Sequence, residues 1–322
     1  MQTISLFEPV LADLQKVEAL LLEIVQVEQA PLAALLGHIV QNKGKRLRPA
    51  IVLLAAKFCR YPLDRLAPVA AAVELLHTAS LVHDDVIDNA ATRRGNPTLN
   101  ALAGSRAPIL IGDFIFAKSA QTAVMGHNLR VMDVFARTLM RICEGELHEV
   151  LSTRRWPQST DEYHEKIACK TASLFSLSAE CGAILSGANE DFIVALRDYG
   201  HNVGMAFQIV DDVLDLVGDE GQLGKPVGGD LRQGTITLPI IYHLDSAPAD
   251  SMVRAIVAGD NHAEAEIQEA IRLIVQSPAI AMSYADARAF ARAAKSALCI
   301  LPDNQYRRAL ARLADYIVER IA

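Results

Sequence analysis

Two acidic segments with the same pattern are the residues best suited to chemistry in this chain. Residues 84–88 read D-D-V-I-D and residues 211–215 read D-D-V-L-D, each within apolar, helix-like sequence. In a helix, the first and fifth residues of such a segment share one face and the second lies close by. Crowded carboxylates repel one another, and Mg²⁺, which binds through one or two carboxylates plus substrate phosphates, removes that repulsion. Two such faces turned toward each other predict a metal-filled cleft for a diphosphate.

An acidic cluster is more often a solvated surface than a site, so the flanking residues must decide between the two. Leu81-Val82 and Val86-Ile87 surround the first segment, and Ile209-Val210 and Val213-Leu214 surround the second. These carboxylates therefore lie in helices that we expect to be largely buried, where an unpaired charge is costly. We predict that cations neutralise them.

The composition favours a large helical core that positions these segments. The 322 residues are 51% hydrophobic but only 5% aromatic, a mix that favours helices over sheets. Helical periodicity continues from end to end, and no linker interrupts it. Helices are predicted at about 5–28, 31–42, 46–59, 64–90, 107–125, 129–152, 160–187, 190–217, 236–245, 249–258, 262–275, 279–299 and 303–320. We predict a single all-α domain over residues 1–322, with the helices packed around a central cavity.

Two stretches without helical periodicity directly follow the acidic segments. The first, residues 89–108, holds Arg93-Arg94-Gly95, and the second, residues 218–239, holds Gly224-Lys225-Pro226. Loops of this length in a compact domain are usually functional or disordered. Their position beside the acidic segments favours lids over the predicted site.

Charge and cysteine content exclude several classes of protein. The formal net charge of −7 argues against a nucleic-acid partner, because phosphate backbones select basic surfaces. Five cysteines without C-x-x-C spacing indicate a reducing compartment, and residues 1–18 lack the basic start of a signal peptide. Lys57, Glu74 and His77 interrupt the longest apolar stretches, so no membrane span is expected. We predict a cytoplasmic protein.

Basic residues stand where a diphosphate would need them. Residues 44–49, G-K-R-L-R-P, place three cations at a predicted helix start, where backbone N–H groups also favour anions; taken alone, such residues are more often a solvated surface turn. Lys170 lies in an apolar helix and needs an acidic partner or ligand. His77 lies two turns before the first acidic pair. Phe207, one turn before Asp211, is either a core residue or a ring that faces a carbocation.

Together these groups suit the departure of a diphosphate. Metal ions and Arg or Lys donors stabilise the charge that develops on a leaving phosphate. If a carbocation forms, the rest of the pocket must be dry and apolar so that water cannot trap it. Apolar helices with acidic ends supply that combination.

At this level of detail the chain resembles the trans-isoprenyl diphosphate synthases, or polyprenyl synthetases. The resemblance covers most of the chain and rests on blocks in the family's order: G-K-R-L-R-P, H-T-A-S-L-V-H-D-D-V-I-D, R-R-G-N-P-T, K-T-A-S-L-F, G-M-A-F-Q-I-V-D-D-V-L-D and G-K-P-V-G-G-D-L. It implies an all-α, homodimeric enzyme that adds isopentenyl diphosphate to an allylic diphosphate such as farnesyl diphosphate. Two or three Mg²⁺ ions are expected with the allylic diphosphate, and release of the product to a membrane is expected.

The resemblance also assigns roles to individual residues. The implied Mg²⁺ ligands are Asp84, Asp85, Asp88, Asp211 and Asp215, with Asp212 and Lys170 as further catalytic residues. Residues implied to bind isopentenyl diphosphate are Lys45, Arg48, His77 and Arg94. Those implied to contact the allylic diphosphate are Arg93, Lys170, Thr171, Gln208 and Lys225. Two positions depart from the family pattern: Thr235 stands where a lysine is common, and Glu149 where a glutamine is usual.

Product length is expected to depend on the helix before the first acidic segment. Ala79 and Ser80 lie about one turn before Asp84, and small side chains there leave room for a growing tail, whereas bulky aromatics would block it. A medium- to long-chain all-trans product, geranylgeranyl or longer, is therefore expected. Candidates for the floor of the tunnel are Met125, Phe135, Leu139 and Met140.

Three other functions fit parts of the sequence. An HD-type metal phosphohydrolase would use His77 and His83-Asp84, but it would not need the second acidic segment. A class I terpene cyclase would have no use for a second diphosphate site at Lys45 and Arg48. A regulatory subunit of a heteromeric synthase should have eroded acidic segments, and both are intact here.

Overall fold

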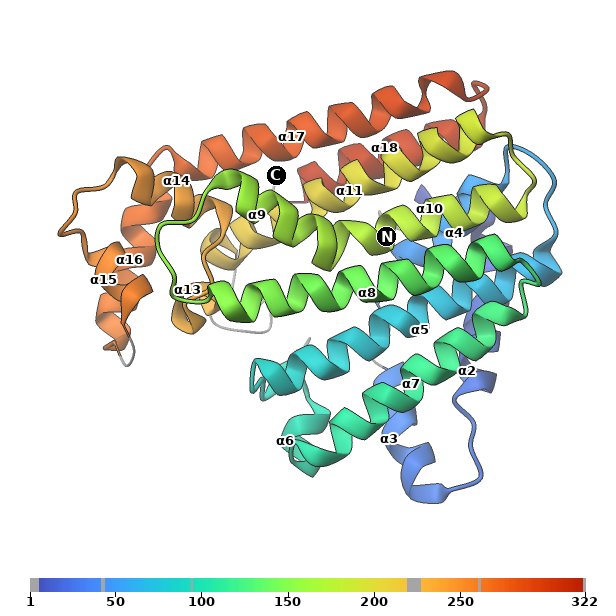
Figure 1. Ribbon diagram of the computed structural model, residues 1–322, viewed down its shortest axis with the longest axis horizontal. Coiled ribbons are helices and arrows are strands. Elements are labelled where there is room, and N and C mark those ends of the chain that lie inside the picture. The colour runs from blue at the N-terminus through green and yellow to red at the C-terminus, as the bar shows by residue number, and fades with distance from the viewer. Residues whose placement is uncertain (1–5, 42–43, 94, 219–226, 260–261, 321–322) are drawn as a thin grey trace. The chain divides into compact units, whose positions relative to one another are not determined.

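The computed structural model describes residues 6–41, 44–93, 95–218, 227–259 and 262–320 (Figure 1). The chain forms two compact units. Unit 1 comprises Met1–Leu139, Leu174–Gly200 and Lys295–Leu313, and unit 2 comprises Met140–Ser173, His201–Ala294 and Ala314–Ala322. The chain passes between the units within helices rather than through a linker. The single domain expected from the sequence stays a prediction.

Unit 1 holds the N-terminal helices and the first acidic segment. Its elements are η1 (Glu8–Val10), α2 (Leu11–Ile24), α3 (Ala30–Gln41), α4 (Leu47–Ala56), α5 (Leu63–Ile87), β1 (Thr92–Arg93), β2 (Asn96–Pro97), α6 (Leu99–Ala103), α7 (Arg106–Val124) and η3 (Leu298–Ile300). Parts of α8 (Leu129–Ser152), α10 (Ser173–Leu185), α11 (Glu190–Val217), α17 (Ala279–Ala297) and α18 (Gln305–Glu319) complete it.

Helix α5 is the core of unit 1. It is apolar on all sides, as expected of a helix that other helices surround, and it packs against α2, α4 and α7. Figure 1 shows α5 and α7 running side by side. A Cβ atom at Gly112 of α7 would lie 2.1 Å from Nε2 of His83 on α5, so a larger residue there would displace the His83 ring.

Unit 2 holds the second acidic segment. Its elements are the end of α8, α9 (Thr160–Ile167), the π-helix η2 (Ala168–Ala172), most of α11, α13 (Gly229–Gln233), α14 (Leu238–Ser246), α15 (Met252–Ala258), α16 (Glu264–Gln276), most of α17 and the end of α18. A capping box begins α9: the Ser159 hydroxyl accepts a hydrogen bond from the Glu162 N–H, and the Glu162 carboxylate accepts one from the Ser159 N–H. Such reciprocal bonds satisfy two backbone donors that a helix start leaves unpaired.

Both units are helical, which confirms the predicted all-α class, but the two expected loops are partly structured. Residues 92–93 and 96–97 pair as a two-stranded antiparallel hairpin, and Gly95 has the left-handed φ of +77° that a tight turn requires. The Thr98 hydroxyl caps α6 by accepting from the Ala101 N–H at 3.1 Å. Left-handed glycines at 228 and 234 bound α13. These are short elements that local turn chemistry creates without helical periodicity.

The predicted helix over residues 160–187 is also interrupted. A single π turn, residues 168–172, separates α9 from α10. Such π turns are rare and frequently mark functional sites, and this one carries Lys170 and Thr171.

One described helix passes the test for a membrane span by length and composition, which the sequence analysis did not anticipate. It is α5, and 67% of its most apolar window is buried inside the structure. Glu74 and His77 are too few to lower its mean hydropathy. Burial of this kind is what a core helix shows.

Candidate active site

The last turn of α5 presents the first acidic segment. The Asp88 N–H donates to the Asp84 carbonyl at 2.8 Å, so the two residues stand one helical turn apart, as predicted. Asp84 is half-buried and Asp88 is exposed, whereas Asp85 is buried. The first and fifth carboxylates of the segment are therefore nearer solvent than the second.

Asp85 bonds to an arginine of the following hairpin. Arg93 Nε donates to Asp85 Oδ1 at 2.7 Å. Burial raises the pKa of the Asp85 carboxyl, and Arg93 acts in the opposite direction. Arg93 was predicted to contact the allylic diphosphate and Asp85 to ligate Mg²⁺; both roles stay predictions, and each requires this ion pair to open or to be shared. Arg94 lies outside the described residues.

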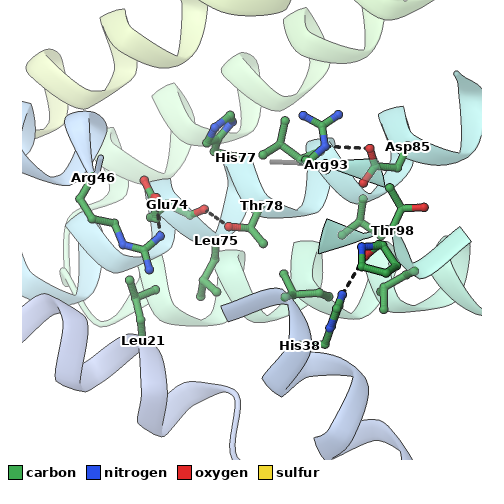
Figure 2. Close-up of a pocket in the computed structure, with 15 residues that line it drawn as sticks. Leu21, His38, Arg46, Glu74, Leu75, His77, Thr78, Asp85, Arg93 and Thr98 are labelled. Carbon is green, nitrogen blue, oxygen red and sulfur yellow. Dashed lines mark hydrogen bonds and ion pairs between the residues drawn. The ribbon is translucent and has the colours of Figure 1, made fainter. Parts of the chain in front are cut away.

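An open pocket of about 790 Å³ lies along α5 beneath the hairpin. Figure 2 shows the Arg93–Asp85 pair at one end of the pocket and the Arg46–Glu74 pair at the other. His77 also lines it, as do Thr78, Leu81 and other apolar side chains. Ala79 and Ser80 are not among its lining residues, because they point to a different side of the helix. The pocket is therefore distinct from the predicted tunnel for the growing tail.

The three cations of residues 44–49 have three different environments. Arg46 caps α4 in the left-handed conformation, φ 51°, and forms ion pairs with Glu18 and with Glu74, the latter at 2.8 Å. Arg48 is buried, and its guanidinium carbon lies 4.4 Å from the centroid of the Phe175 ring. Lys45 is exposed. Arg46 stands at the start of α4, as predicted, and two glutamates neutralise it; the substrate-binding roles of Lys45 and Arg48 stay predictions.

In unit 2, Asp212 and Asp215 of the second acidic segment are buried, and Asp212 has two side-chain donors. The Tyr163 hydroxyl donates to Asp212 Oδ2 at 2.6 Å, and Gln208 Nε2 donates to Oδ1 at 2.7 Å. The Thr171 hydroxyl donates to Gln208 Oε1 at 2.6 Å. Three residues predicted for this site, Thr171, Gln208 and Asp212, are therefore joined in one chain of hydrogen bonds.

The electrostatics of this chain follow from its burial. Burial raises the pKa of Asp212 to about 7, although hydrogen bonds from Tyr163 and Gln208 oppose the shift. Burial and the neighbouring carboxylate raise the pKa of Tyr163 well above its usual value. The phenol therefore remains protonated and acts as a donor.

Asp215 and Asp211 also contact protein donors. Asp215 Oδ2 accepts from the Asp230 N–H at 3.1 Å, which ties it to the start of α13. Asp211 Oδ1 accepts from Arg320 at 2.9 Å. The same guanidinium lies 4.3 Å from the centroid of the Phe207 ring, so one face of the ring already contacts a cation of the protein.

Lys170 has the acidic partners that its apolar surroundings predict. Its ammonium lies 2.8 Å from Glu149 and 3.0 Å from Glu146. The pKa of Glu149 lies below its usual value: burial raises it, but Lys170 and Lys166 lower it by more. A Cβ atom at Gly145 would lie 2.5 Å from the Lys170 backbone nitrogen, so glycine lets α8 approach the π turn. Lys225 lies outside the described residues.

The donors present suit Mg²⁺ rather than a metal with an all-protein cage. Among the residues that the structure describes, no three carboxylate, histidine or cysteine side chains form such a cage. Mg²⁺ needs none, because it retains waters and takes its remaining ligands from one or two carboxylates and from phosphates. Asp84 and Asp88 in unit 1, and Asp211 and Asp215 in unit 2, offer carboxylates of that kind.

Comparison with known proteins assigns the chain to a family. The model of the polyprenyl synthetase family matches residues 29–274. The chain belongs to the polyprenyl synthetase family. It is 43% identical over 310 residues to heptaprenyl diphosphate synthase component 2 of Geobacillus stearothermophilus, covering 96% of each chain. It is 35% identical over 314 residues to octaprenyl diphosphate synthase of Escherichia coli, covering 96% of each.

Solved structures of polyprenyl synthetases share the fold. A polyprenyl synthase from Caulobacter crescentus, crystallised with calcium and isoprenyl diphosphate, superposes with a TM-score of 0.96 at 36% identity, covering 99% of this chain and 98% of that one. A decaprenyl diphosphate synthase from Rhodobacter capsulatus gives a TM-score of 0.93 at 36% identity, with 99% of each chain covered. The predicted family, helical fold and prenyltransferase class are confirmed.

Several polar residues at the site of this polyprenyl synthetase were not predicted from the sequence. Tyr163, Lys166 and Arg320 were not assigned to the site, although each contacts or neighbours a predicted residue. Tyr163 and Lys166 lie two turns and one turn before Lys170 in the helical sequence, and that spacing is the signal available in the sequence. Arg320 lies 109 positions from Asp211, and no local pattern connects the two.

Asp212 should give the metal-free protein a characteristic dependence of stability on pH. Its pKa is about 7 in the folded chain against 3.8 ordinarily, so its stabilising contribution is present below about pH 4 and is lost as the pH rises through about 7. Each pH unit in that window should cost up to about 1.4 kcal/mol. Urea unfolding in EDTA at pH 5 and pH 8 measures the loss, and Asp212→Asn should remove it. Equal losses in both proteins would contradict the assignment to Asp212.

Proposed function

We propose that this polyprenyl synthetase condenses isopentenyl diphosphate with an allylic diphosphate, such as farnesyl diphosphate, to give a longer all-trans polyprenyl diphosphate. The observation that carries the proposal is the chain of hydrogen bonds from Thr171 through Gln208 to Asp212 in unit 2. It holds the π turn with Lys170 against the turn of α11 that carries the acidic segment. An ammonium and several carboxylates in one place fit a diphosphate and its metal ions.

The protein groups suit ionisation of the allylic carbon–oxygen bond. When bound, Mg²⁺ spreads the charge of the diphosphate and makes it a better leaving group. Lys170 supplies a further positive charge to the departing oxygens. Attack by the isopentenyl double bond forms the new carbon–carbon bond, and the departing diphosphate takes up the proton that is then lost. No protein nucleophile is needed.

A product assay with the purified chain tests this proposal. With Mg²⁺, farnesyl diphosphate and radiolabelled isopentenyl diphosphate, the chain alone should form a polyprenyl product longer than farnesyl, and EDTA should abolish it. A double variant, Asp84→Asn with Asp211→Asn, is the matched control and should be inactive. If the isolated chain incorporates no radiolabelled isopentenyl diphosphate at any magnesium concentration, the proposal is wrong for the isolated chain.

A second candidate is a component of a two-chain synthase. The supporting observation is the name of a relative that is 43% identical, a heptaprenyl diphosphate synthase component 2. In that case the chain would be active only with a partner, and the isolated protein would fail the assay while a cell extract restores it. The intact acidic segments favour a catalytic component over a regulatory one. We also propose that the enzyme acts in the cytoplasm.

The expected long product depends on the small side chains above the first acidic segment. Ala79 is fully buried, and the Ser80 hydroxyl donates to the His77 carbonyl at 2.9 Å. Of the four candidate floor residues, Phe135 is buried in unit 1, whereas Met125 and Met140 are exposed in the single chain. Phe135 is thus the best candidate for the floor.

Ser80→Phe should shorten the product by at least one isoprene unit, because the ring would block the path of the growing tail. Chromatography of dephosphorylated, radiolabelled products measures the length. Thr78→Phe is the matched control: it adds the same ring to the same helix, but on the side that lines the open pocket, and the product length should not change. Equal product lengths for Ser80→Phe and the unmodified chain would reject this placement of the tunnel.

The predicted homodimer is supported by exposed apolar side chains at the two ends of α7. Ile109 and Leu110 near its start are 45% and 69% exposed in the single chain, and Val124 and Met125 at its end are 54% and 48% exposed. Exposed apolar side chains that gather in patches mark protein interfaces. We propose that a second copy covers these residues.

Leu110→Asp should convert the dimer into a monomer, because a carboxylate would lose its hydration in the interface. Light scattering during gel filtration measures the mass. Val194→Asp, which changes an exposed apolar residue on α11, should leave the mass at twice that of the chain. A monomeric unmodified protein would contradict the homodimer.

A further inference from the structure

Arg320, just beyond the end of α18, is anchored by four contacts in unit 2. Its guanidinium donates to Asp211 Oδ1 at 2.9 Å and to the Phe207 carbonyl at 3.3 Å. It stacks on the Phe207 ring at 4.3 Å, and its Nε donates to the Ile317 carbonyl at 3.3 Å. The Arg320 side chain is only 13% exposed.

These contacts restrict the orientation of a partly exposed carboxylate. The Asp211 side chain is 41% exposed, and a carboxylate at a helix surface samples several rotamers. Phe207 and Asp211 lie one turn apart on the same face of α11, so one planar guanidinium spans both. A carboxylate has two oxygens, and a hydrogen bond at Oδ1 is compatible with a metal at Oδ2.

We propose that Arg320 is a positioning residue that orients Asp211 toward Mg²⁺, an inference that rests on the proposed function. Carboxylates that bind metals are commonly held by a second hydrogen bond, which reduces the number of orientations that the metal must select. Asp212 and Asp215 already have such donors in Tyr163, Gln208 and the Asp230 N–H. Arg320 provides the corresponding donor for Asp211.

The opposite role, an arginine that merely takes the place of the metal, fits the geometry less well. A stand-in cation must leave when the metal arrives, so its position should depend mainly on the carboxylate. Arg320 instead keeps three contacts that do not involve Asp211, two of them to backbone carbonyls. It therefore remains in place whether or not Asp211 binds a metal.

The test is the magnesium dependence of Arg320→Ala and Arg320→Lys in the full chain. The Mg²⁺ concentration for half-saturation is measured twice, in prenyl transfer at saturating substrates and in calorimetric binding of inorganic diphosphate. Arg320→Ala should raise the Mg²⁺ concentration for half-saturation about 10- to 100-fold in both measurements, with little change in the KM for isopentenyl diphosphate. Arg320→Lys, which keeps the charge but loses the planar fork, should give a smaller rise.

Arg308→Ala is the matched control, because Arg308 lies on α18, the helix that precedes Arg320, is 62% exposed and pairs with Asp303. It should leave the magnesium dependence unchanged. An unchanged half-saturation in folded Arg320→Ala would overturn the positioning role, and a lower one would establish the stand-in role instead. If Arg320→Ala does not fold, an unchanged Mg²⁺ concentration for half-saturation in Arg320→Lys also overturns the positioning role. An unmodified chain that binds no inorganic diphosphate with Mg²⁺ would overturn the proposed function itself.

Discussion

The structure depends on one constraint: acidic side chains within apolar helices must be compensated. An uncompensated buried carboxylate costs several kcal/mol, and both acidic segments place their second aspartate inside the protein. Asp85 meets the charge of Arg93, while Asp212 receives two neutral donors, Tyr163 and Gln208. The two solutions differ in kind. The ion pair between Arg93 and Asp85 can open when the hairpin moves. The buried hydrogen bonds from Tyr163 and Gln208 instead hold Asp212 in one position.

The same constraint explains the surroundings of Lys170. A partly buried ammonium favours acidic partners, and Glu146 and Glu149 provide two for Lys170, while Lys166 lies 3.9 Å from Glu149. Two cations and two carboxylates thus balance within a small volume. Glu149, which departs from the family's usual glutamine, contributes one of those negative charges.

Much of the fold could be predicted because helical periodicity is a local property. The segments at α8 and α11 begin and end where the sequence indicates, and Lys170 revealed its need for acidic partners through its apolar neighbours. The hairpin, α6 and α13 escaped prediction because they contain too few residues for a periodic signal. The partners of Asp211 and Asp212 escaped because tertiary packing, not spacing, brings Arg320 and Tyr163 to them across 109 and 49 positions. The roles of the site residues remain predictions for the same reason: spacing identifies candidates but not their contacts.

The tight backbone contact at Gly145 has a consequence for redesign of the enzyme. Because no side chain fits between α8 and the π turn, the glycine at residue 145 determines the position of Lys170. Residue 149, one turn along α8, determines how strongly the charge of Lys170 is neutralised. The position and the charge balance of Lys170 are therefore set by two different residues. Substitutions at residue 149 can therefore alter the affinity for substrate without moving Lys170.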